Sequence, residues 1–80
     1  MDNYEAKIKT IISKIIKVPV DRISNEDDLV DRHGMDSLAR VEVITELELA
    51  FDISIDDKAA MHLRSVNKCL EFVERAKTKK

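Results

Sequence analysis

The chain has 80 residues, enough for one domain with a thin core and too few for a deep catalytic cleft. Charged residues make up 38% and hydrophobic residues 44%, which is typical of a soluble helical domain. No apolar run is long enough to span a bilayer, and the N-terminus lacks the pattern of a signal peptide. We therefore expect a single domain over residues 1–80, located in a reducing cytoplasm, with Cys69 as a buried thiol.

Charge is distributed unevenly along the chain, although the formal net charge is only −2. Residues 18–57 contain twelve Asp or Glu and three Lys or Arg, so this acidic segment carries −9. The acidic segment disfavours nucleic acid as a partner and favours enzymes with basic docking surfaces. A solvated surface without a partner explains the same composition.

One Gly, one Pro and many helix formers predict an all-α fold. We expect a small four-helix bundle with a long first loop and a short third helix. The first helix can be capped by Asp2 or Asn3 and is stopped by Pro19. Its apolar residues follow amphipathic spacing: Tyr4, Ile8, Ile11, Ile12 and Ile15.

Helical periodicity is lost from Val18 to Met35, which predicts a long ordered loop. Its isolated apolar residues, Ile23, Leu29 and Val30, are expected to hold it to the core.

The second helix is predicted from Ser37 to Phe51, with two different faces. The core face comprises Val43, Ile44, Leu47, Ala50 and Phe51. The other face is mixed apolar and acidic and comprises Leu38, Val41, Glu42, Thr45 and Glu48. That composition suits docking onto a partner, although an ordinary solvent face explains it too.

The remainder of the chain predicts two further helices. A short third helix is expected from Asp57 to Leu63, and Ser65 can cap the fourth. The buried face of the fourth helix comprises Val66, Cys69, Leu70, Val73 and Ala76. Residues 77–80 form a basic tail that we expect to fray.

The most informative segment runs from Gly34 to Ile44 and places Ser37 at the start of a helix, behind a polar loop. A hydroxyl there is exposed and faces the positive end of the helix dipole, which favours a phosphate ester. A plain capping serine is the alternative. Met35-Asp36-Ser37-Leu38 and the residues after it closely resemble the phosphopantetheine attachment site of acyl carrier proteins.

The resemblance extends from about Ile8 to Val73 and implies a carrier without enzymatic activity. In that family a separate synthase transfers 4'-phosphopantetheine from coenzyme A, here to Ser37. The thiol of the arm then carries an acyl group as a thioester to fatty-acid or related biosynthetic enzymes. By resemblance, Asp36 assists recognition by the synthase.

The resemblance also assigns two sets of residues. Partner enzymes would contact Leu38, Val41, Glu42, Thr45 and Glu48. An acyl chain would lie between the second and third helices, in a space lined by Leu47, Phe51, Ile55, Ala60 and Leu63. Core packing alone explains these last five residues equally well.

Several positions depart from the usual fatty-acid pattern, notably Ala39, Arg40 and the weakly acidic third helix. They favour a specialised carrier over a housekeeping one. Arg40 falls near the buried stripe, so its guanidinium should extend outward, toward an acid of the loop. It has either no role, or it narrows the mouth of the acyl space or binds a polar cargo.

Other readings of the sequence stay open. Within the carrier class, the chain can serve a polyketide, peptide or amino-acyl pathway. An unmodified helical interaction module is the alternative of another class. A hydrolytic triad of Ser37, His33 and Asp36 is disfavoured because sequence neighbours rarely meet its geometry. We expect a monomer with no metal site, no nucleic acid and no stable membrane insertion.

Overall fold

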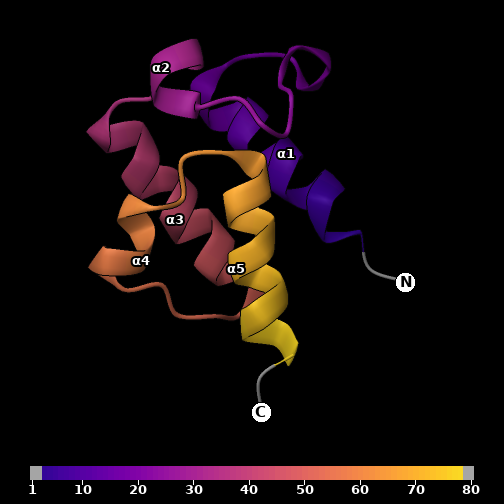
Figure 1. Cartoon of the computed structure of the whole chain (residues 1–80), viewed down its shortest axis with the longest axis vertical. Helices are drawn as coiled ribbons and strands as arrows, with labels where there is room; N and C mark the ends of the chain where they lie inside the picture. Colours follow the sequence, from indigo (N-terminus) through magenta and orange to yellow (C-terminus); the bar gives the residue numbers. More distant parts are fainter. Residues whose placement is uncertain (1–2, 79–80) are drawn as a thin grey trace.

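The structure, a computed structural model, describes residues 3–78 (Figure 1). Over this range the chain forms five α-helices and one short 3-10 helix, which confirms the predicted all-α class. In chain order they are α1 (Tyr4–Ile16), η1 (Val20–Arg22), α2 (Leu29–His33), α3 (Ser37–Phe51), α4 (Asp57–Met61) and α5 (Val66–Thr78). No helix in the described range is long and apolar enough to cross a bilayer.

The core lies between the three long helices, because α1 packs against both α3 and α5. Each helix contributes side chains from one apolar face, and each fully buried Leu, Ile or Val stabilises the fold by about 1.5–3 kcal/mol. The buried core residues of these helices are Ile8, Ile12, Val43, Leu47, Phe51, Val66, Cys69 and Val73.

Helix α1 begins and ends as local chemistry dictates. The side chain of Asn3 accepts a hydrogen bond from the Ala6 N–H at 3.0 Å, so Asn3 is the cap. Asp2, the other expected cap, lies outside the described residues. The helix ends at Ile16, before Pro19, and Lys17 takes a left-handed conformation with φ 61°.

The prediction that residues 18–35 contain no helix is wrong. They contain η1 and the five-residue helix α2, whose Val30 and Asp31 N–H groups donate to the carboxylate of Asp28. Gly34 ends α2 with φ 69°, a conformation that glycine adopts without steric cost. One turn of helix is too short to show an apolar period, so periodicity could not reveal it.

The loop is nevertheless anchored as expected, because Ile23 and Leu29 are buried and Val30 is half-buried. Three polar contacts fix its backbone as well. Asn25 Nδ2 donates to Glu5 Oε2 at 2.7 Å, and Asn25 accepts at its carbonyl from the Asn67 N–H at 3.0 Å. The Leu29 N–H donates to the Arg64 carbonyl at 2.7 Å.

Helix α3 has the predicted bounds, and Val43, Leu47 and Phe51 are buried as expected. Ala50, predicted on the core face, is exposed. It lines a shallow hollow beside Ala6 and Lys7 of α1, where its methyl group is too short to fill the space.

The C-terminal half differs from prediction at two points. Helix α4 ends at Met61 and not at Leu63 as predicted. Leu63 is buried, but it belongs to the loop that follows the helix. Residue Lys77 was expected to fray, but α5 continues through it and its Nζ donates to the Phe51 carbonyl at 3.0 Å. A cation there satisfies a carbonyl at the end of α3. Residues 79–80 lie outside the described part.

Candidate functional site

Ser37 is the exposed first residue of α3, and the segment before it is held in place. Met35 is buried at 3% exposure, and its N–H donates to the Leu29 carbonyl at 3.0 Å. Asp36 is the helix cap, because its carboxylate accepts from the Ala39 N–H at 2.8 Å. The serine is therefore presented from a fixed loop at the positive end of the helix dipole.

The contacts of Asp36 and Ser37 argue against the alternative that Ser37 is only a helix cap. Because Asp36 satisfies the helix start, the Ser37 hydroxyl is not needed as a cap. Within residues 3–78 that hydroxyl has no hydrogen-bond partner. An exposed, unpartnered hydroxyl at a helix N-terminus fits a phosphodiester, whose negative charge the nearby N–H groups stabilise.

His33 and Asp36, which would complete a hydrolytic triad with Ser37, both contact other groups. His33 Nε2 lies 2.9 Å from Asp27 Oδ2, and this hydrogen bond is the main cause that lowers the pKa of Asp27. Asp36 is committed to the Ala39 N–H. The three side chains therefore do not form the linked serine, histidine and carboxylate arrangement that nucleophilic hydrolysis needs.

Four of the five predicted docking residues, Leu38, Val41, Glu42 and Thr45, are exposed. Leu38 is 71% and Val41 59% exposed, which is unusual for large apolar side chains beside one another and is typical of an interaction surface.

Glu48 differs from this group. It is half-buried, and its Oε2 accepts from the Ile55 N–H at 2.8 Å. Its carboxylate thus holds the loop between α3 and α4, a role that the helical spacing did not indicate.

A groove of about 410 Å³ runs between α3 and α4. Of the five residues expected to line an acyl space, Ile55 and Ala60 line this groove, whereas Leu47, Phe51 and Leu63 lie in the core. The groove residues of α3 are Arg40, Val41, Ile44, Thr45 and Glu48, and those of α4 are Asp57, Ala60 and Met61. Arg40 is half-buried there, and within residues 3–78 it has no ion pair with an acid of the loop.

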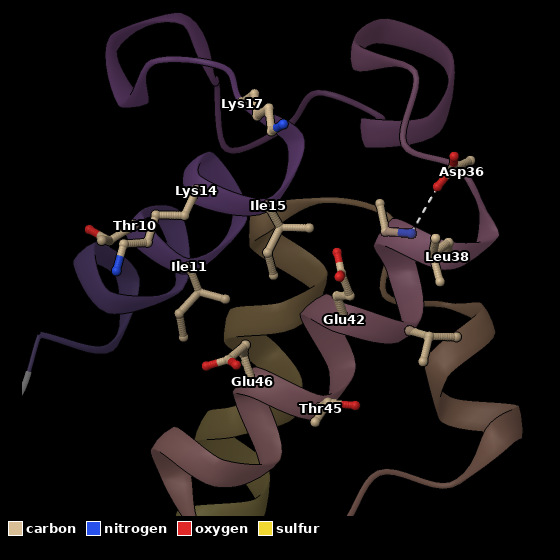
Figure 2. A pocket seen from close by; sticks show the side chains of 12 residues that line it. Thr10, Ile11, Lys14, Ile15, Lys17, Asp36, Leu38, Glu42, Thr45 and Glu46 are labelled. Carbon is tan, nitrogen blue, oxygen red and sulfur yellow. Dashed lines mark hydrogen bonds between the residues drawn. The ribbon is translucent and has the colours of Figure 1, made fainter.

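A second groove, of about 790 Å³, lies at the surface where α1 and α3 meet (Figure 2). Its apolar part comprises Ile11 and Ile15 of α1 and Leu38, Ala39 and Val41 of α3, and Glu42 and Glu46 approach from α3. The sequence patterns did not predict this groove. The signal was present in Ile11 and Ile15, which lie at the edge of the apolar stripe of α1 and are only half-buried.

Comparison with known proteins gives a consistent result. A family model described as phosphopantetheine attachment site matches residues 6–73. The acyl carrier protein of Buchnera aphidicola subsp. Schizaphis graminum is 42% identical over 73 residues, covering 91% of this chain and 92% of the relative. That of Buchnera aphidicola subsp. Acyrthosiphon pisum is 38% identical over the full length of both chains. That of Desulforapulum autotrophicum is 44% identical over 74 residues, covering 91% and 96%.

The family model and the helical fold are those of a domain that carries a covalently attached prosthetic group. With this length of match, the chain belongs to the acyl carrier protein family. Its cofactor is 4'-phosphopantetheine, covalently attached, and the family interacts with a synthase and with acyl-processing enzymes.

Proposed function

We propose that Ser37 carries the 4'-phosphopantetheine arm, and that the protein presents acyl intermediates as thioesters to fatty-acid or related biosynthetic enzymes in the cytoplasm. The observation that supports Ser37 is its exposed hydroxyl, without a partner in residues 3–78, beside a neighbour that already caps the helix.

Modification is a phosphoryl transfer by the synthase. The Ser37 oxygen attacks the phosphorus bonded to the pantetheine of coenzyme A, a new P–O bond forms, and 3',5'-ADP leaves. The hydroxyl proton passes to a base of the synthase. The N-terminus of α3 stabilises the charge of the resulting phosphodiester. When bound, the group supplies a terminal thiol that holds the acyl chain as a thioester activated toward attack.

The protein itself does no chemistry on the acyl group in this proposal. Enzymes with basic docking surfaces bind the face formed by Leu38, Val41, Glu42 and Thr45, and the acidic segment steers their approach. The groove between α3 and α4 shelters cargo between encounters, with Ile55 and Ala60 in its wall.

The pathway is proposed to be a specialised one. Arg40 in the groove and the weakly acidic α4 both depart from the fatty-acid pattern. A discrete carrier of a polyketide, peptide or amino-acyl pathway is the second candidate. The aspartate before Ser37 favours acyl cargo over peptidyl cargo.

The test is intact-mass spectrometry after incubation with a phosphopantetheinyl transferase, coenzyme A and Mg²⁺. The protein should gain one phosphopantetheinyl group, and Ser37→Ala should gain none. Ser54→Ala is the matched control, because Ser54 is exposed in a loop, and it should be modified like the parent protein. Modification of Ser37→Ala, or mapping of the group to Ser65, would contradict the proposal.

A further inference from the structure

We propose that Arg40 binds the phosphodiester on Ser37 and thereby turns the phosphopantetheine arm toward the groove between α3 and α4. The proposal rests on the attachment of the arm at Ser37. It assigns Arg40 a positioning role, since the residue contacts the anchor of the arm and not the acyl thioester.

The first support is helical position. Counted from Ser37, the α3 residues of this groove include positions i+3, i+4, i+7 and i+11, namely Arg40, Val41, Ile44 and Glu48. Residues at these spacings share one side of a helix. Ser37 therefore lies at the N-terminal end of the side of α3 that lines the α3/α4 groove.

The second support is the state of Arg40. It is half-buried in the groove wall, and within residues 3–78 its guanidinium has no hydrogen bond or ion pair. The groove contains two acids: Glu48 already accepts from the Ile55 N–H, and Asp57 of α4 forms no ion pair with Arg40 among the described residues. Long helical side chains lean toward the helix N-terminus, which carries Arg40 over the turn that contains Ser37. A guanidinium is well suited to bind a phosphate through two parallel N–H donors.

The third support is the charge on the opposite side of α3. Figure 2 shows Glu42 pointing into the groove between α1 and α3, with Asp36 at the end of that groove beside the helix start. Lys14, a cation of the α1 wall, points away from α3 in the same view. On this side a phosphate would meet the carboxylates of Asp36 and Glu42, with Lys17 as a further cation of the groove. On the α4 side Arg40 lies one helical turn from Ser37.

A carboxylate on the acyl cargo is the other anion that Arg40 could bind. The phosphodiester is favoured because it is tethered three residues away and is present in every modified molecule, whatever the cargo. Tethering raises its effective concentration at Arg40 without any further contact.

The experiment follows the direction of the arm in the modified protein without cargo. A nitroxide attached to the arm thiol broadens the NMR signals of nearby amides. Cys69 will not take the label, because it is fully buried and burial raises its pKa to about 12. The unmodified protein, treated identically, checks this. The readout is the broadening at Ala60 and Met61 of α4 relative to that at Thr10 and Ile11 of α1.

In the parent protein the broadening should be concentrated on α4. Arg40→Gln should lower the α4-to-α1 ratio about two- to fivefold, the range expected from a partly exposed ion pair, and Arg40→Lys should retain part of it. Lys58→Gln removes one charge from α4 outside the groove and should leave the ratio unchanged. Amide spectra of the unmodified variants confirm that each is folded.

An equal ratio in Arg40→Gln and the parent protein would overturn the proposal. So would a ratio that responds to Arg40 only when the nitroxide label on the arm thiol itself bears a carboxylate, since a carboxylate in the position of the cargo would then be the ligand. If the transferase adds no arm to the parent protein, nothing is labelled, and it is the proposed attachment at Ser37 that fails.

Discussion

Glu42 and Glu48 lie on the same helix and carry the same charge, yet their surroundings differ. Glu42 is exposed at the edge of the α1/α3 groove, whereas Glu48 is half-buried and holds the Ile55 N–H at 2.8 Å. Helical spacing placed both on one docking face. The contact that separates them joins residues across a loop, so it could not be found from periodicity.

The two carboxylates should therefore respond differently to charge reversal. Glu42→Lys should slow association with the synthase and reduce its salt dependence, with little change in melting temperature. Glu71→Lys, at an exposed position of α5 outside both grooves of α3, is the matched control for net charge and should affect association less. Stopped-flow binding at low salt measures both, and equal rates for the two variants would argue against the docking face.

Glu48→Lys should act on the fold. Loss of its hydrogen bond to the loop should cost about 1–2 kcal/mol of unfolding free energy. Glu48→Gln, which retains an acceptor oxygen, should cost less. Urea melts of the three proteins measure this, and a Glu48→Lys variant as stable as the parent would show that the Ile55 contact contributes nothing.

At the scale of elements, α3 was predicted to the residue because fifteen residues give several turns of apolar period. Short elements carried no such signal. Helix α2 was missed, and α4 was extended to Leu63 because a buried apolar residue in a loop looks like one more helical position. The motif predicted Ser37 as the attachment residue and stays a prediction, whereas the capping role of Asp36 depends on a backbone conformation that the sequence leaves open.

Asp36 combines a structural contact with a proposed recognition role, and two substitutions separate them. Asp36→Ala removes the α3 cap and should cost about 0.5–2 kcal/mol of stability. Asp36→Asn retains a capping oxygen and removes only the charge, so stability should change little while modification by the synthase slows. Melting curves and initial modification rates test this. If Asp36→Asn is modified at the parent rate, the carboxylate charge has no part in recognition.

For the whole molecule, two effects of the carboxylates oppose each other. Repulsion within the acidic segment, which carries a net charge of −9, destabilises the fold, whereas specific contacts of some of the same carboxylates stabilise it. The hydrogen bond with His33 lowers the pKa of Asp27, and the Asp31 N–H, with further help from Arg64, lowers the pKa of Asp28. In the folded protein the pKa of each carboxyl lies below its usual value of 3.8, so each binds a proton less readily than in the unfolded chain. Their stabilising contribution is therefore complete above that value and is lost as pH falls through the folded pKa.

Stability should accordingly pass through a maximum at mildly acidic pH. Protonation of unpaired carboxylates first relieves repulsion, and protonation of Asp27 and Asp28 at lower pH then removes native contacts. Mg²⁺ at neutral pH should also raise the melting temperature, because it reduces the repulsion between carboxylates. Melting curves across pH at matched ionic strength, with and without Mg²⁺, measure both effects. A steady fall from neutral pH with no response to Mg²⁺ would show that specific contacts outweigh repulsion.

The central claim is that this chain works as a carrier through an arm on Ser37. Peptide mass mapping of the protein isolated from its own cells, before and after hydroxylamine treatment, tests it most directly. We expect phosphopantetheine on the peptide that contains Ser37, with an additional acyl mass that hydroxylamine removes because it cleaves thioesters. A native protein whose Ser37 peptide is unmodified would contradict it.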